Sequence, residues 1–72
     1  MRIVSSDKEA DCPYERGMVV YYGSEKTLAF TMNNLNASML MEDVSEERAV
    51  EIMEEIRTAY KLGRTCYECP EE

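Results

Sequence analysis

The sequence predicts a small α+β domain, in which an antiparallel sheet of about four strands is followed by one amphipathic C-terminal helix packed on one face. Two observations favour this fold class. Apolar residues upstream of residue 42 come in short β-prone runs separated by turn residues, which is typical of strands. Residues 45–62 instead repeat apolar side chains every three or four positions, which is typical of a helix. The length predicts one domain over residues 1–72, with residues 1–44 rich in strands.

The first strands are predicted from short runs of β-branched and aromatic residues. MRIVS at residues 1–5 is such a run, and a polar loop follows it as far as Pro13. MVVYY at residues 18–22 is predicted to be the central strand, because it is too short and too β-branched to favour a helix. GSEK at residues 23–26 is a turn, and TLAFTM at residues 27–32 completes a hairpin with alternating apolar residues.

A second turn and a fourth strand are predicted next. NNLN at residues 33–36 is a turn signal, because asparagine bonds to its own backbone and tolerates positive φ. Residues 37–41 resume a strand. Strict alternation places one apolar side chain, Leu40, on the opposite face from the other three, which are Ala37, Met39 and Met41.

The helix at residues 45–62 has a start signal, an apolar face and a stop signal that agree. Ser45 can cap the first free amides, and Glu46 and Glu47 lie in the first turn, where the helix dipole favours negative charge. Gly63 is the residue type that ends helices. Beyond it, residues 63–72 are predicted to form an extended, partly frayed tail. The predicted apolar stripe consists of Ala49, Ile52, Met53, Ile56, Ala59 and Tyr60.

Charge and hydropathy exclude several classes of partner. Lys and Arg number 8 against 15 Asp and Glu, and the formal net charge is −7. A broad basic face for the nucleic-acid backbone is therefore absent, and we expect no direct nucleic-acid binding. No apolar run approaches the ~20 residues of a membrane span, and no signal-peptide pattern opens the chain. We expect a cytoplasmic protein without membrane contact, whose acidic surface is either solvated or faces a basic partner.

Self-association is predicted from the helix count. One helix cannot shield both faces of a sheet, and Tyr21, Tyr22 and Leu40 suggest that the second face is not fully polar. A second copy of the chain is the simplest cover for such a face, so we expect a homodimer or higher oligomer. The alternative is a monomer with a few singly exposed apolar side chains.

The three cysteines form a weak motif. Cys66 and Cys69 have the C-x-x-C spacing of zinc and redox sites, and Cys12 is the third cysteine. A zinc site would still need a fourth ligand from a carboxylate, such as Asp11 or Glu68, or from a symmetry copy. The odd count fits a reducing compartment, and incidental reduced thiols are the preferred interpretation, with no metal expected.

Catalytic signatures are missing from the sequence. Without histidine, the usual general base and the Ser-His-Asp and Cys-His arrangements are excluded, and no glycine-rich phosphate loop occurs. The neighbouring carboxylates Glu51, Glu54 and Glu55 are better explained as a solvated helix face than as an acid–base pair. We therefore expect a protein that is not an enzyme and has no cofactor.

Four short stretches of the chain resemble small phage and prophage proteins. Those proteins open with a similar Arg-Ile-Ile-Ser-Gln-Asp strand, continue to a Pro-Tyr-Glu step and end on a Ser-x-Glu-Glu-[Lys/Arg]-Ala helix that finishes in Ala-Tyr. The matching stretches of this chain are MRIVSSD at residues 1–7, PYE at 13–15, VSEERA at 44–49 and IRTAY at 56–60.

This group is similar to the Thoeris anti-defence sponge proteins, which oligomerise and sequester the signalling nucleotides of bacterial immunity. The resemblance implies a non-catalytic trap for a cyclic nucleotide, held between subunits in the host-cell cytosol. Arg16 and Arg57 are the candidate phosphate ligands, because each adjoins a matching motif, and Tyr14 is the candidate stacking residue. On residue types alone, structural roles for these arginines and tyrosines remain the simpler interpretation. The alternative function is an acidic, anti-CRISPR-like inhibitor that blocks the basic nucleic-acid groove of a host effector protein.

Overall fold

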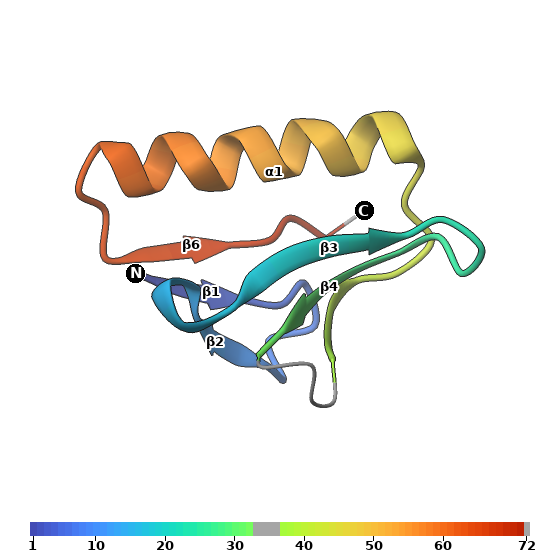
Figure 1. The fold of residues 1–72 in the computed structure, drawn as a ribbon, viewed down its shortest axis with the longest axis horizontal. Coiled ribbons are helices and arrows are strands. Elements are labelled where there is room, and N and C mark those ends of the chain that lie inside the picture. Colours follow the sequence, from blue (N-terminus) through green and yellow to red (C-terminus); the bar gives the residue numbers. More distant parts are fainter. Residues whose placement is uncertain (33–36, 72) are drawn as a thin grey trace.

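The computed structural model describes residues 1–32 and 37–71, so the turn predicted at residues 33–36 lies outside the described residues. It contains six short strands, one 3₁₀ turn and one α-helix (Figure 1). In chain order these are β1 (Arg2–Val4), β2 (Asp11–Pro13), η1 (Tyr14–Arg16), β3 (Met18–Tyr22), β4 (Thr27–Thr31), β5 (Ser38–Met41), α1 (Glu46–Lys61) and β6 (Cys66–Glu68).

The strands form two three-stranded sheets, in the orders β2-β1-β6 and β3-β4-β5. The α+β class is confirmed, but the prediction of one antiparallel sheet of about four strands is wrong. β6 lies in the predicted tail and pairs parallel to β1, with Ile3 opposite Tyr67. β2 lies in the predicted polar loop and pairs antiparallel to β1. Strands of three residues carry no readable alternation, and both depend on β1 for their hydrogen bonds.

A bulge in β5 turns two consecutive side chains into the core. Leu28 lies opposite Met41, but the next residue of β4, Ala29, lies opposite Met39, which leaves Leu40 as the extra residue. Leu40 and Met41 are 0% and 2% exposed. The predicted placement of Leu40 on the opposite face from Met41 is therefore wrong, because a bulge breaks the two-residue period. The carbonyl of Leu40 accepts a 2.8 Å hydrogen bond from Ser6 N–H, which links the two sheets.

The helix begins and ends as predicted. The Ser45 hydroxyl accepts a 3.2 Å hydrogen bond from Arg48 N–H, which caps the first turn. At the other end Gly63 has φ of 77°, and the amides of Gly63 and Arg64 donate to the carbonyls of Tyr60 and Ala59. This pair of bonds is a Schellman motif, which explains why glycine is required there. Within the described residues, no helix is long and apolar enough to cross a membrane.

α1 packs against both sheets rather than across one face of a single sheet. It contacts β3 and β6, and Figure 1 shows it lying over both strands. Ala49, Ile52 and Ile56 are fully buried, as the apolar stripe predicts, but Tyr60 is 46% exposed and does not belong to the core. The other buried apolar members of the core are Ile3, Cys12, Leu28, Phe30, Leu40, Met41, Val44 and Cys69.

The face of β3-β4-β5 that points away from this core carries no charged side chain among its described strand residues. The strand registers place Val20, Ala29 and Met39 side by side on this outer face. Met18 and Tyr22, on the same face, are 60% and 41% exposed. Tyr21, by contrast, points inward and donates a 2.5 Å hydrogen bond to the Val44 carbonyl. We define the uncharged face as Met18, Val20, Tyr22, Thr27, Ala29, Thr31 and Met39.

Replacing Gly17 by alanine is expected to destabilise the fold by about 1–3 kcal/mol, because it overpacks a closed site. A Cβ at this position would collide with the Thr31 carbonyl oxygen and lie 2.7 Å from the Phe30 ring. Urea unfolding should show a lower midpoint with an unchanged slope. Gly23→Ala is the matched control, since the nearest atom to its added Cβ is 3.8 Å away. Equal midpoints for the two variants would contradict the packing described here.

Candidate functional site

Two of the three predicted binding residues line one cavity. This cavity has a volume of about 200 Å³ and lies between η1, the start of β3 and one side of α1. Tyr14 reaches it from η1, and Arg57 reaches it from the helix. We call it the Tyr14–Arg57 cavity. Its complete lining is Tyr14, Gly17, Met18, Val19, Met53, Ile56 and Arg57.

Tyr14 is held in place by backbone and ring contacts. Its amide donates a 2.9 Å hydrogen bond to the Met1 carbonyl, which fixes the start of η1 beside β1. The amino group of Met1 in turn forms an ion pair with Glu15. The Tyr14 ring lies 5.0 Å from the Tyr60 ring, with an angle of 58° between their planes. This tilted aromatic pair is partly open to solvent, because Tyr60 is 46% exposed.

Arg57 lines the same cavity as Tyr14 from the helix side. Arg57 and Tyr60 are three residues apart on α1 and are therefore neighbours on the helix surface. Arg57 is exposed and forms no ion pair with any described residue. Other guanidinium groups are engaged, since Arg2 pairs with Asp11 and Arg48 pairs with Glu51. Pairing with a carboxylate thus explains Arg2 and Arg48, but not Arg57.

Arg16 does not join the cavity. It is the last residue of η1 and is exposed, but it does not line the space between Tyr14 and Arg57. The side chains of Tyr14 and Arg16 point in different directions. In a 3₁₀ turn, with about three residues per turn, side chains two positions apart do not lie on the same face.

The cavity offers a ligand two kinds of interaction, stacking on an aromatic ring and attraction to a positive charge. Aromatic rings stack on nucleobases, and an unpaired guanidinium suits a phosphate. A volume of about 200 Å³ is below the roughly 300–1,000 Å³ of typical ligand pockets. The cavity of one chain thus accommodates a base or a phosphate rather than a whole cyclic nucleotide.

Three residues of this region were not predicted as part of a site. Tyr60 is one of several tyrosines that could stack on a base, but the sequence favours a place in the core, and its spacing from Arg57 is the one signal that puts it beside that residue. Met18 and Met53 line the cavity because β3 runs beneath the helix. No local pattern indicates that placement, since it depends on how two distant elements pack.

The C-x-x-C motif does not converge on one point. Cys66 lies on β6 and is exposed, whereas Cys69 follows that strand and is buried in the core with Cys12. Among the described residues, no group of three or more Cys, Asp or Glu side chains is placed to hold a metal ion. The zinc-site alternative therefore finds no ligand set in the described part of the chain.

Comparison with protein-family models, with curated proteins and with solved structures finds no significant match to this chain. The resemblance to anti-defence sponge proteins therefore stays a prediction from the quoted motifs. The functional argument depends on the geometry of the chain itself.

One thiol of the three is expected to react rapidly with Ellman's reagent in the native protein. Cys66 is exposed, whereas Cys12 and Cys69 are buried. Burial and the proximity of Cys12 raise the pKa of the Cys69 thiol to about 12, and burial also raises the pKa of the Cys12 thiol. Both should react roughly a hundredfold more slowly, because they are reached only when the fold opens. Cys66→Ser should abolish the rapid phase, and two rapid thiols would contradict the described burial.

Proposed function

We propose that this protein binds and sequesters a cyclic nucleotide signal without changing it chemically, in the manner of an anti-defence sponge. The observation that carries the proposal is the meeting of Tyr14 and Arg57 in one cavity. These residues are far apart in sequence, and both are predicted ligand residues in or beside the resembling motifs. Stacking on the Tyr14–Tyr60 pair would hold the base, and Arg57 would bind a phosphate oxygen.

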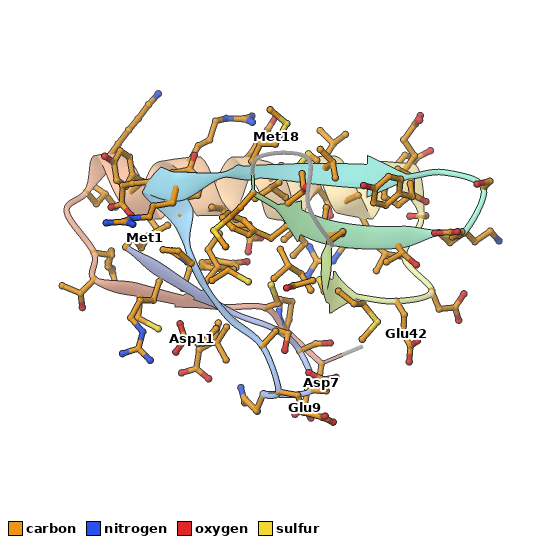
Figure 2. The ribbon with its side chains drawn as sticks, turned by 60° about the horizontal axis from the view of Figure 1, so that its bottom comes forward. Met1, Asp7, Glu9, Asp11, Met18 and Glu42 are labelled. Atoms are coloured by element: carbon orange, nitrogen blue, oxygen red, sulfur yellow. The ribbon has the colours of Figure 1, made fainter. Side chains whose placement is uncertain are left out.

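A second copy of the chain would complete the binding site. The Tyr14–Arg57 cavity is too small for the whole ligand, so the remaining ligand surface needs another wall. Met18 belongs both to this cavity and to the uncharged face of β3-β4-β5, and Figure 2 shows it projecting outward from β3. Packing of two uncharged faces would bring a second chain to the mouth of the cavity. The acidic side chains of α1 lie outside that face, so little charge would be desolvated.

Self-association can be measured without any ligand. We expect the wild-type protein to sediment as a dimer or higher oligomer at micromolar concentration. Val20→Glu should shift it toward the monomer by about tenfold or more in dissociation constant, since it places a charge in the centre of the uncharged face. Val50→Glu is the control, because Val50 is already 48% exposed on α1. A wild-type monomer at all concentrations would contradict the two-chain site.

Ligand binding is tested by equilibrium dialysis against cyclic ADP-ribose-type molecules and cyclic dinucleotides. Wild-type protein should deplete one of them stoichiometrically, and denaturation should release it chemically intact. Arg57→Gln should weaken binding by about tenfold or more, because a charge-assisted hydrogen bond is lost.

Arg64→Gln provides the matched control for that substitution. Arg64 is also an exposed arginine without an ion pair among the described residues, but it follows the C-terminal end of α1 and does not line the Tyr14–Arg57 cavity. It should leave binding unchanged within about twofold. No depletion of any ligand in the panel, or recovery of a hydrolysed product, would overturn the proposed function.

A further inference from the structure

A second concave surface lies along the opposite side of α1. It is a groove of about 760 Å³ between the helix and β6, and we call it the α1–β6 groove. Glu51, Glu54 and Glu55 line it from the helix, and Tyr67 and Glu68 line it from the strand. It shares no residue with the Tyr14–Arg57 cavity, so its role can be argued independently of nucleotide binding.

β6 is an edge strand whose outer side faces this groove. It ends the sheet order β2-β1-β6, and no described strand pairs with its outer edge. On the inner edge, the Thr65 carbonyl accepts from Arg2 N–H and the Cys69 amide donates to the Val4 carbonyl, each at 2.9 Å. Alternate residues of a strand direct their backbone groups to opposite edges. Cys66 and Glu68 therefore direct their N–H and C=O groups outward, where they can pair with an added strand.

The charges along the groove indicate which kind of added peptide strand can bind there. Four glutamates line it against two arginines, Arg48 and Arg64. Arg48 is bonded to Glu51 at 3.0 Å and also lies 3.8 Å from a Glu55 oxygen, so Glu54 is the helix glutamate of the groove that it does not pair with. The Tyr67 hydroxyl donates a 2.7 Å hydrogen bond to Glu55, and burial together with this carboxylate raises the pKa of Tyr67. Lys8, which does not line the groove, forms an ion pair with Glu68. Four carboxylates thus face three cations, and the remaining excess of one negative charge favours a cationic segment.

The spacing of the glutamates matches an extended chain. Glu51 and Glu55 are four residues apart on the helix, which corresponds to a rise of about 6 Å. Side chains two residues apart on a strand are separated by about 6.6 Å and lie on the same face. A strand added to β6 thus places every second side chain opposite successive carboxylates of α1.

A second copy of this chain does not fit the same groove. Pairing of β6 with another β6 would bring two sets of groove carboxylates together, and like charges placed against each other are destabilising. Nucleic acid is disfavoured for the same reason. The occupant that the charges favour is a basic polypeptide.

We propose that the α1–β6 groove is a docking site for an extended basic segment of another protein. The segment adds to the free edge of β6 as a fourth strand of that sheet, and alternate Lys or Arg side chains face Glu51, Glu54 and Glu55. This site gives the acidic-inhibitor alternative a defined surface and a defined mode of recognition.

The test uses an end-blocked peptide in which Lys alternates with Val, measured by fluorescence anisotropy on the full chain. Glu51→Gln/Glu54→Gln should weaken its binding by about tenfold or more. Glu9→Gln/Glu42→Gln is the matched control, since it changes the net charge equally. Glu9 and Glu42 lie along the edge of the molecule away from α1 (Figure 2), so this variant should change binding by less than about twofold. Equal weakening by both variants would show non-specific charge attraction and overturn the proposal.

Strand addition is tested separately with two N-methylated peptides. One is methylated on the Lys amides and the other on the Val amides, so each blocks a different edge of the peptide strand. Docking on β6 requires one of these peptides to lose binding by about tenfold or more while the other retains it. Similar binding of both methylated peptides, or no binding of the unmethylated peptide, would overturn the proposal. Arg57→Gln should leave peptide binding unchanged, which separates this result from any failure of nucleotide binding.

Discussion

The fold depends on β1, because this strand is paired on both edges and joins the two ends of the chain. Ile3, at its centre, is fully buried and lies between Cys12 on β2 and Tyr67 on β6. A parallel pair needs a long crossover connection. Here the crossover from β1 to β6 includes the whole β3-β4-β5 sheet and the helix. Closing this connection holds the C-terminal end of α1 over one sheet, while the Ser6–Leu40 hydrogen bond ties the other sheet to the loop after β1.

α1 depends on the two sheets for its stability, and it also completes the core that they share. At 16 residues, α1 is barely longer than the limit of about 12–15 residues below which isolated helices are marginal in water even in favourable sequences. Burial of Ala49, Ile52 and Ile56 supplies the missing stabilisation, and those side chains meet residues from both sheets in one cluster. Among the described residues, the buried apolar side chains of both sheets, apart from Ala29, belong to one cluster. The small core therefore forms only when both sheets and the helix are in place, which explains how three-residue strands persist.

Features that depend on neighbouring residues could be predicted from the sequence, whereas features that depend on the packing of distant segments could not. The cap at Ser45, the glycine stop and the β3-β4 hairpin depend on neighbouring residues, and each is confirmed. β6 has no periodicity and exists because β1 provides a partner, and the Leu40 bulge depends on how β5 meets β4. At the candidate site, the choice of Tyr14 and Arg57 came from residue chemistry beside the resembling motifs. Their meeting in one cavity required the packing of η1 against α1, which no spacing in the sequence encodes.

The polar surface of α1 has an arginine side and a glutamate side, and Glu54, three residues before Arg57, lies at the boundary between them. Arg57 and Glu55 are two positions apart, which corresponds to about 200° around a helix axis, so they project to nearly opposite sides. Tyr60 lies with Arg57, whereas Glu51 lies with Glu55 in the α1–β6 groove. Exposed charges are screened beyond about 8–10 Å in physiological salt. A net charge of −7 thus describes the whole molecule and not each of its surfaces. Under the two proposals, the arginine side would attract an anionic ligand and the glutamate side a cationic chain, so that one helix would serve both.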